Sequence, residues 1–393
     1  PLLGEPRFSH DGKRLFAHDM MGLAAYDIHD AKKVTHFGGP GPGHLVHAVF
    51  SPKGDKIAVG SMPGYVTVCD PLGQPIGKPL SLSDDPTKSG NMHPGDFWHL
   101  SWHPDGRHLL AIAHAAVLFD VEEGKRVASL SPSPGNSAAF APDTPDHIIF
   151  TSPNGTSLWR WKVEREPSLR VDALGQLVPS PDGKVLLTRG MGNGTPIVIS
   201  TDLKTRTPLA PEDLKGPALC WLPDGKHFLA GTNPLTIRSL DGALVETINP
   251  VDGVNTASVE KLQLSPDGKS IVGHARGNNR FFLLNLADKR LSALPGIGTN
   301  LSVHYGSHYF AAVFSPDGKY LILPEESTLT YWNLATKELE QIVLFLPDGQ
   351  HVIVSPAGEV LARSKNAEQY YRYLVEDKTG RLHLKSAAEF ERQ

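Results

Sequence analysis

Histidine is the residue type in this chain whose number and spacing could support chemistry. The chain has 393 residues, of which 18 are histidines. Two groups combine histidines with aromatic or acidic residues: His93, His99 and His103 around Asp96 and Trp98, and His304 and His308 beside Tyr305 and Tyr309. A zinc site needs three or four ligand atoms that converge within about 2.2 Å of the metal. The spacing does not show such convergence, so we interpret these residues as loop and channel histidines and predict no metal and no cofactor.

Other stretches that could carry chemistry have simpler interpretations. The glycine-rich stretches 39–43 and 190–194 are each followed by extended sequence and not by a helix, so no helix N-terminus is present to bind a phosphate. The acidic pair Asp84-Asp85 lies in a polar stretch that predicts a solvated loop. The sequence contains no nucleophile elbow, Walker A loop, zinc-protease histidine pair or Cys-x-x-Cys motif. We therefore predict that the protein is not an enzyme.

The elements that must position these residues are strands joined by one repeated turn. The stretch Phe314-Ser-Pro-Asp-Gly-Lys319 returns with small changes along the chain. Proline presets φ for a turn, aspartate suits the next position, and glycine supplies the positive φ that closes a hairpin. The glycines of the copies are Gly12, Gly54, Gly106, Gly183, Gly225, Gly268, Gly318 and Gly349. A β-rich run follows each turn, which predicts pairs of antiparallel strands.

The spacing of the turns predicts the architecture. The gap of 77 residues between Gly106 and Gly183 contains a worn copy of the turn at 140–143. The spacings are then about forty residues, apart from two of about fifty and a final one of 31, and this period is typical of a four-stranded propeller blade. Helical periodicity is absent until the last few residues. We predict an all-β, single β-propeller of eight four-stranded blades; seven blades is the alternative if one unit is displaced or shared across the closure.

The end of the chain predicts an extension to the propeller. We place the propeller at 1–345 and a C-terminal β extension that packs on it at 346–393. The extension contains strand-like sequence and ends with Ser386 and Glu389, whose spacing is that of a helix N-cap and its capping-box partner. A β-hairpin and a short helix would cover the exposed edge of a blade. A separate binding module is the alternative.

The repeats resemble those of WD40-type propellers. At the positions of that family's Gly-His and Trp-Asp pairs the chain has Gly43-His44, Tyr26-Asp27, Cys69-Asp70, Phe119-Asp120 and Trp332-Asn333. The similarity covers about residues 4–345, but no repeat has an intact Trp-Asp, and similar turns are common in TolB-like and YVTN-like bacterial propellers. The C-terminal stretch is similar to one that follows the repeats in planctomycete-type bacterial WD40 proteins. The resemblance implies a bacterial repeat protein that acts as a scaffold for protein–protein interactions.

Composition limits the partners and the compartment. The net charge is −4, and no Lys/Arg cluster is long enough to neutralise a run of phosphates, so we predict no nucleic-acid partner. No apolar run approaches the ~18 residues of a transmembrane segment. Cys69 and Cys220 lie in distant repeats, which predicts two small buried residues without a disulfide. This favours the cytoplasm, while the periplasm and secretion stay open.

The interruptions of the repeat carry the predicted partner-binding residues. The two long spacings place extra residues in connections from an outer strand to the next inner strand, at Leu82–Asp96 and Pro295–Ser307. Long loops on a rigid scaffold often carry function, and aromatic residues dominate binding hot spots. We predict partner contacts for Phe97, Trp98, His99, His304, Tyr305, Tyr309, Met62 and Arg276. For Phe97 and Trp98 the alternative is packing at the start of an inner strand.

Two functions fit this sequence. The first is a non-catalytic propeller scaffold that binds protein partners through its long-loop face, alone or as a subunit of a larger assembly. The alternative is a ligand-binding or enzymatic propeller, lactonase-like or TolB-related, that uses the central channel. Metal-dependent propeller enzymes line this channel with carboxylates and histidines, whereas Glu260 is the acidic residue that stands out in the predicted inner strands. This difference favours the scaffold.

Overall fold

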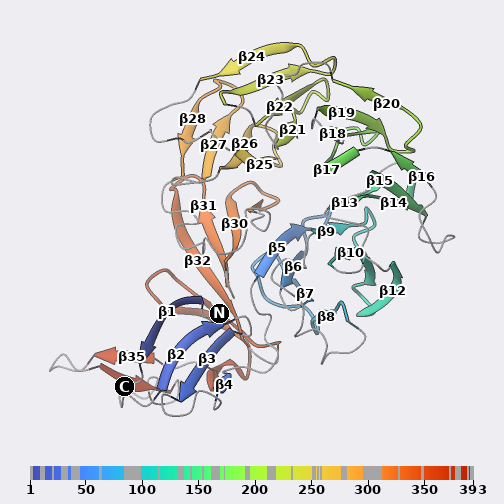
Figure 1. Ribbon diagram of the computed structural model, residues 1–393. Helices are drawn as coiled ribbons and strands as arrows, with labels where there is room; N and C mark the ends of the chain where they lie inside the picture. Colours follow the sequence, from blue (N-terminus) through green and yellow to red (C-terminus); the bar gives the residue numbers. More distant parts are fainter. Residues whose placement is uncertain are drawn as a thin grey trace.

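The computed structural model is built from short antiparallel strands, most of which form a ring of small sheets (Figure 1). The structure describes most of residues 45–370, with gaps at 62–63, 84–98, 114–115, 131–136, 142–143, 153–154, 161–168, 172, 191–194, 210–217, 232, 250–253, 255, 257–258, 276–280, 295–311, 326–327 and 347–348. Beyond this range it describes 3–8, 14–19, 22–27, 34–36, 373–376, 382–386 and 389.

Each blade of the ring is a sheet of strands that follow one another in the sequence. Blade one contains β5 (Leu45–Phe50), β6 (Ile57–Ser61), β7 (Tyr65–Cys69) and β8 (Leu80–Ser81). Blade two contains β9 (His99–Trp102), β10 (His108–Ile112), β11 (Ala116–Asp120) and β12 (Lys125–Leu130). Blade three contains β13 (Ser137–Ala141), β14 (Thr144–Ser152), β15 (Gly155–Arg160) and β16 (Leu169–Val171). Blade four contains β17 (Ala173–Pro179), β18 (Val185–Gly190), β19 (Pro196–Ser200) and β20 (Arg206–Pro208).

The remaining blades follow the same plan. Blade five contains β21 (Leu219–Trp221), β22 (His227–Ala230), β23 (Leu235–Ser239) and β24 (Leu244–Ile248). Blade six contains β25 (Val259–Leu264), β26 (Ser270–Ala275), β27 (Phe281–Asn285) and β28 (Leu291–Ala293). Blade seven contains β29 (Val313–Phe314), β30 (Tyr320–Glu325), β31 (Thr328–Asn333) and β32 (Glu338–Phe345). The first strand of each blade lies nearest the axis of the ring, and the fourth lies farther out (Figure 1).

The repeated turn has the predicted geometry. Gly54, Gly106, Gly183, Gly225, Gly268 and Gly318 adopt positive φ angles between 63° and 71°. In blade seven the N–H of Gly318 donates to the carbonyl of Ser315 at 2.8 Å, and Asp317 Oδ1 accepts a hydrogen bond from the N–H of Lys319 at 3.0 Å. The hairpins predicted from Ser-Pro-Asp-Gly are therefore confirmed.

Neighbouring turns also touch one another. A Cβ atom added to Gly54 of blade one would lie 2.5 Å from Cγ of Pro316 in blade seven. The same addition at Gly268 of blade six would lie 3.2 Å from Cγ of Pro223 in blade five. Glycine is needed at these positions both for its φ angle and for the close approach of the proline of the preceding blade.

The ring closes between blade seven and blade one. Strand β5 contacts both β29 and β30. The hydroxyl of Tyr331 donates to the carbonyl of Pro71 at 3.3 Å, and Gln341 Nε2 donates to the carbonyl of Leu72 at 3.1 Å. The seven blades between residues 45 and 345 therefore form a complete ring.

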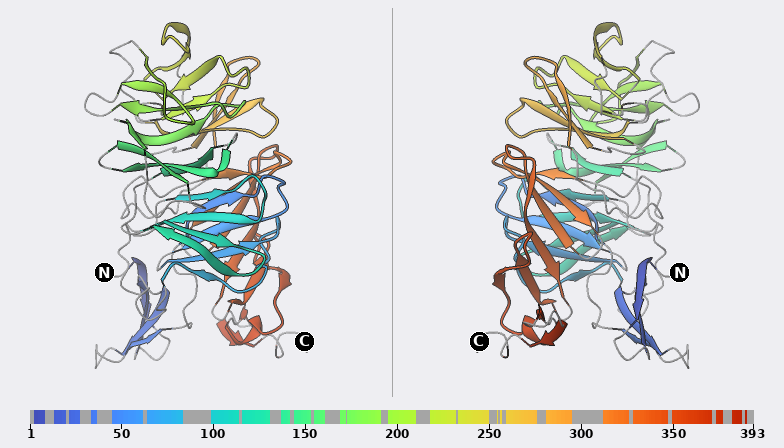
Figure 2. Two further views of the ribbon diagram at one scale, coloured as in Figure 1. Left: turned by 90° about the vertical axis from the view of Figure 1, so that its right-hand side faces the viewer. Right: turned by 90° about the vertical axis from the view of Figure 1, so that its left-hand side faces the viewer.

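The prediction of eight blades is wrong, and the seven-blade alternative with one displaced unit describes the structure. The N-terminal unit consists of β1 (Leu3–Phe8), β2 (Arg14–Asp19), β3 (Gly22–Asp27) and β4 (Val34–His36). These strands form their own four-stranded sheet, which lies outside the ring (Figures 1 and 2). The reason is that blade seven already occupies the face of blade one that an eighth blade would need.

Apolar side chains between adjacent blades form the core. One cluster joins blades five and six through Leu229, Ile237, Leu262 and Phe282. Cys69 and Cys220 are buried and free, as predicted.

The C-terminal segment extends the sheet of blade seven. Strand β33 (His351–Val354) pairs with β32, and β34 (Val360–Arg363) pairs with β33, so this sheet has six strands. A short 3-10 helix, η3 (Ala367–Gln369), and the hairpin of β35 (Tyr373–Glu376) and β36 (Leu382–Lys385) follow. The predicted capping box is confirmed: the N–H of Ser386 donates to Glu389 Oε2 at 2.7 Å, and the N–H of Glu389 donates to Ser386 Oγ at 3.3 Å. Within the described residues, no helix has the length and apolar character of a membrane span.

Candidate functional site

Most of the predicted partner-binding residues lie outside the described part of the chain. This holds for Met62, Phe97, Trp98, Arg276, His304, Tyr305 and Tyr309, and also for His93, Asp96 and His308. Their predicted role therefore stays a prediction. His99 is described, and it is the first residue of β9.

The strand directions define one face of the ring. Each innermost strand runs toward its repeated turn, so each begins on the opposite face, which we call the connection face. The chain enters β9 at His99 after residues 84–98, and it enters β29 at Val313 after residues 295–311. Both long spacings of the sequence therefore fall between an outer strand and the start of an innermost strand on this face.

His99 contacts a second histidine near the axis. Its ring lies 5.1 Å from the ring of His47, centroid to centroid, at an interplanar angle of 65°. His47 belongs to β5 of blade one, and the His99 imidazole also forms a hydrogen bond with the backbone of Ala138 on β13 of blade three. The histidine pair therefore links the innermost strands of three consecutive blades.

The charge of Lys261 in blade six acts on both histidines, and we call His47, His99 and Lys261 the axial cluster. Burial, together with the charge of Lys261, lowers the pKa of His99 to about 4. Burial and the neighbouring His99 and Lys261 lower the pKa of His47 well below its ordinary value. Burial lowers the pKa of Lys261 to about 8, although the carboxylate of Glu260 acts in the opposite direction. At neutral pH the cluster therefore contains two uncharged imidazoles and one ammonium group.

The three residues occupy the same position in their repeats. Each lies four residues before the first residue of its turn, which is Ser51 in blade one, His103 in blade two and Ser265 in blade six. The strand register agrees, because His47 pairs with Gly60, His99 with Ile112 and Lys261 with His274 across equivalent hairpins. This position was the signal in the sequence that could have identified His47 and Lys261, which the motif search missed.

The single carboxylate of the described innermost strands lies beside a histidine. Glu260 Oε2 lies 3.8 Å from Nδ1 of His274, whose ring packs 4.9 Å from that of Phe281. The remaining described innermost strands carry neither Asp nor Glu. Among the described innermost strands, Glu260 is therefore the single acidic residue.

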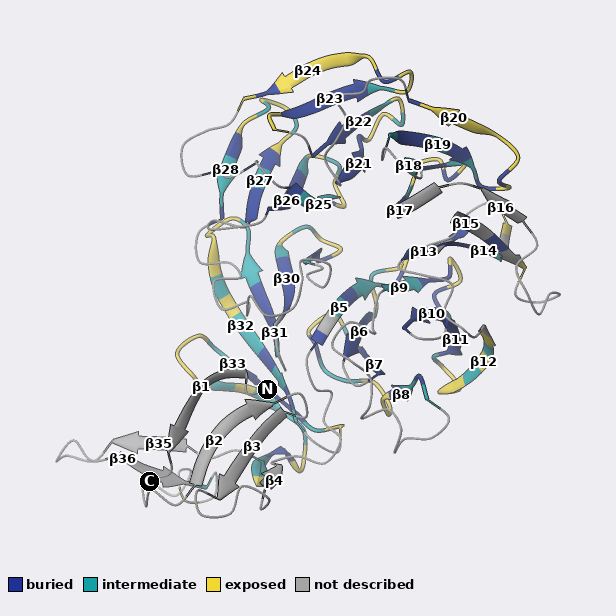
Figure 3. Cartoon of the chain, in the orientation of Figure 1, coloured by how far each residue is buried: buried dark blue, intermediate teal, exposed yellow. Residues whose placement is uncertain are grey.

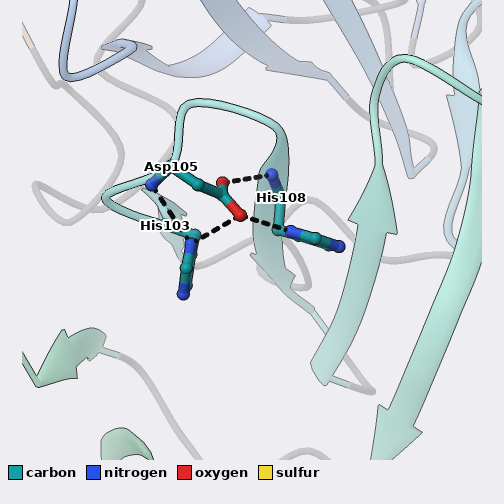
Figure 4. Close-up of side chains that lie close together, drawn as sticks. All are labelled: His103, Asp105 and His108. Carbon is teal, nitrogen blue, oxygen red and sulfur yellow. Dashed lines mark hydrogen bonds and ion pairs between the residues drawn. The ribbon is translucent and has the colours of Figure 1, made fainter. Parts of the chain in front are cut away.

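A second histidine group lies in the turn of blade two. Asp105 Oδ2 lies 2.9 Å from Nδ1 of His103 and 2.7 Å from Nδ1 of His108, so the carboxylate stands between two imidazoles (Figure 4). Its other oxygen accepts hydrogen bonds from the N–H groups of Arg107 and His108 at 2.8 and 3.0 Å. Burial alone would raise the pKa of Asp105, but these hydrogen bonds hold it well below its ordinary value.

Two imidazoles and a carboxylate are a ligand set that can bind zinc. The three ligand atoms lie within 4.8 Å of one another. However, Asp224 and His227 form the same pair at 2.5 Å in the turn of blade five, where Leu222 replaces the third ligand. His103 Nδ1 also accepts a hydrogen bond from the N–H of Asp105 at 3.2 Å, which uses the lone pair that a metal would need. We therefore assign this trio to the structure of the turn.

The residues at the Trp-Asp positions of the resemblance also serve turns. Asp120 accepts hydrogen bonds from Arg107, at 2.6 and 2.8 Å, and from the N–H groups of Glu122 and Glu123. The hydrogen bond from Arg107 lowers the pKa of Asp120. Asn333 accepts from the N–H groups of the two residues that begin the equivalent turn of blade seven. These side chains thus cap the connection from the third to the fourth strand.

Comparison with models of known protein families gives no match, and comparison with curated proteins gives no significant match.

Proposed function

We propose that this protein is a non-catalytic propeller scaffold that binds protein partners through the connection face. The observation that carries the proposal is the arrangement of the longest connections. Of the connections between consecutive blades, the two longest run from β8 to β9 and from β28 to β29, and both enter innermost strands on this face. Loops of this length on a rigid scaffold are usually functional.

The rigidity of the ring supports this role. The indole N–H of Trp102 donates to the carbonyl of Val49 in blade one at 3.0 Å, and that of Trp221 donates to Val178 in blade four at 2.8 Å. Equivalent tryptophans thus connect two pairs of adjacent blades by the same hydrogen bond. A scaffold tied in this way holds the strands that begin and end its long connections in fixed relative positions, which lowers the entropy that binding must overcome.

Affinity capture with the wild type and with the Trp98→Ala/Tyr305→Ala double variant tests the proposal. A recovered protein is then purified, and its dissociation constant is measured for both forms. We expect the double variant to bind at least about tenfold more weakly, because truncation of an aromatic hot spot costs about 2 kcal/mol or more. The matched control is Lys226→Ala/Lys269→Ala, which changes two residues of the repeated turns on the opposite face. Equal binding by the double variant and the wild type would show that the connection face is not the interface.

A further inference from the structure

Strand β24 of blade five has an open edge. Among the described strands it pairs with β23 alone, and residues 244–247 are all exposed (Figure 3). From residue 246 to residue 248 its antiparallel register with β23 is regular. An edge strand directs the N–H and C=O groups of every second residue away from its neighbour, where they can pair with another chain.

The outer strands of the other blades carry features that protect an edge from such pairing. A short strand, a basic side chain and a proline all have this effect. Strands β8, β16 and β28 have only two or three residues. The longer ones contain basic residues or proline: Lys125 in β12, Arg206 and Pro208 in β20, and Arg363 in β34. Strand β24 has five residues and no Lys, Arg or Pro, and its one irregularity is a bulge at Val245.

The charge of this edge is negative. Residues 239–248 contain Asp241 and Glu246 and neither Lys nor Arg. Hydrogen bonds from the hydroxyl of Ser239 and from the N–H of Ala243 lower the pKa of Asp241, so this carboxylate is charged at neutral pH. Two copies of this edge would bring like charges together, which disfavours pairing of β24 with itself and favours a basic segment.

Apolar side chains accompany this charge. Seven large apolar side chains are exposed among the described residues, and three of them lie here: Leu240, Leu244 and Val245, at 37%, 55% and 53%. An added strand would remove part of this apolar surface from water, which is favourable. The edge therefore fits a strand that has apolar as well as basic side chains.

Blade seven shows that the fourth strand of a blade can accept a further strand. Strand β33 pairs with β32 in antiparallel register, with His351 opposite Phe345 and Ile353 opposite Val343. That strand comes from the C-terminal segment of the chain itself, whereas no described strand covers β24. The cover of β24 must therefore come from another molecule.

We propose that the open edge of β24 binds an extended segment of a partner protein, in which apolar residues alternate with Lys or Arg, as a fifth strand of blade five. Backbone hydrogen bonds supply the affinity, while contacts with Leu244 and Val245 and an ion pair with Glu246 select the sequence. This surface is the edge of an outer strand, so the proposal goes beyond the role of the connection face. The Trp98→Ala/Tyr305→Ala variant should bind the segment as the wild type does.

Synthetic peptides test the proposal with the intact protein. Labelled peptides with the core Val-Thr-Val, flanked on both sides by Lys, Glu or Ser, are compared by fluorescence anisotropy. We expect the lysine peptide to bind most tightly, and its Lys-Val-Pro-Val-Lys version not to bind, because proline removes a backbone N–H. Glu246→Lys should weaken the lysine peptide about fivefold and strengthen the glutamate peptide by a similar factor, because cross-strand charge pairs contribute up to about this much. The matched control is Glu338→Lys on β32, which makes the same change of charge and should leave both affinities unchanged.

Hydrogen exchange measured by mass spectrometry locates the bound peptide. The lysine peptide should slow exchange of the amides of β24 severalfold and leave those of β12 unchanged. No binding of the lysine peptide up to about 1 mM would overturn the proposal. Equal binding of the proline version, or protection outside blade five, would do so as well. Protection of β24 that rises with protein concentration in the absence of peptide would show that the occupant is a second copy of this chain, and that the proposed partner is wrong.

Discussion

The fourth strands of blade seven and blade five differ in length, with eight residues in β32 and five in β24, and they also differ in their surroundings. Beyond β32 of blade seven, the chain adds β33 and β34, and Val352 and Ile353 of β33 are buried. Beyond β24 of blade five, no further described strand pairs with the sheet. Leu244 and Val245 of β24 are 55% and 53% exposed, and the strand is coloured as exposed over most of its length (Figure 3).

The difference shows that the edge strand is covered at blade seven and exposed at blade five. An uncovered edge presents unpaired backbone groups that can pair with another chain. Among the described strands, such a cover is found at the blade to which the C-terminal segment is nearest in sequence. Blade five keeps its apolar edge exposed, and its stability must come from contacts on its inner side.

The largest loss of stability that tests the comparison of blades seven and five is expected for a substitution in β33, the strand that covers β32. Ile353 is 4% exposed and packs in the cluster that joins blades seven and one. Ile353→Ala should lower the free energy of unfolding by about 2–4 kcal/mol, because it leaves a cavity in the core. Val245→Ala on β24 is the matched control and should change it by less than about 0.5 kcal/mol, since the side chain is exposed. Urea denaturation measures both. A similar loss in the two variants would mean that β24 is covered in solution.

A smaller effect is expected on the inner side of blade five. Trp221→Phe keeps most of the apolar contact but removes the hydrogen bond to the carbonyl of Val178. The free energy of unfolding should fall by about 1–2 kcal/mol, because a partly buried acceptor loses its donor. Trp102→Phe in blade two removes the equivalent bond and should cost a similar amount. If neither substitution changes the urea midpoint, these bonds do not stabilise the ring.

The smallest effect concerns a polar group on the outer strand of blade seven. Glu340 accepts hydrogen bonds from Asn333 at 2.9 Å and from Tyr320 at 2.8 Å, which lower its pKa together with the charge of Lys319. Because the pKa is lower in the folded protein, this contribution to stability is present above the unfolded value of about 4.3 and is lost as the pH falls through the folded value. Glu340→Gln should therefore cost less than about 1 kcal/mol at neutral pH, since the side chain is exposed to solvent.

The pH dependence of Tm measures this contribution. The difference in Tm between the wild type and Glu340→Gln should shrink as the pH is lowered from about 6 to about 3. Glu246→Gln on β24 is the control, because Glu246 forms no hydrogen bond or ion pair with a described residue through its side chain. A difference that stays constant with pH would contradict the assigned role of Glu340.

The local turns could be predicted from the sequence, but the closure of the ring could not. Proline, aspartate and glycine determine the hairpin through the φ angles of a few consecutive residues, so each copy was recognisable alone. The copies that end at Gly12 and Gly54 share Phe-Ser and Gly, and each lacks one of the other two turn residues, yet the first belongs to a sheet outside the ring. Which units close the ring depends on contacts such as that between Tyr331 and Pro71, and these leave no local signal.

The candidate site was predictable only in part for the same reason. His99 was identified because other histidines are near it in the sequence, but those neighbours are not its partners in the axial cluster. Its partners His47 and Lys261 lie in other blades, and their common position in the repeat gains meaning only when the ring brings the innermost strands together. The opposite holds for His103, Asp105 and His108 in the turn of blade two. These residues are close in sequence, and their contacts stabilise the local turn.

The closure of the ring also has a consequence for the kinetics of folding. The hydrogen bonds of Tyr331 and Gln341 to blade one join residues that are 260 and 269 positions apart. During synthesis, blades one to six are complete before blade seven can contact blade one. Until then, the faces of blades one and six that blade seven will cover have no neighbouring blade. Contacts between distant residues slow folding because the chain must first lose the entropy of a long loop. We expect the junction of blades seven and one to form last, after the individual hairpins have assembled.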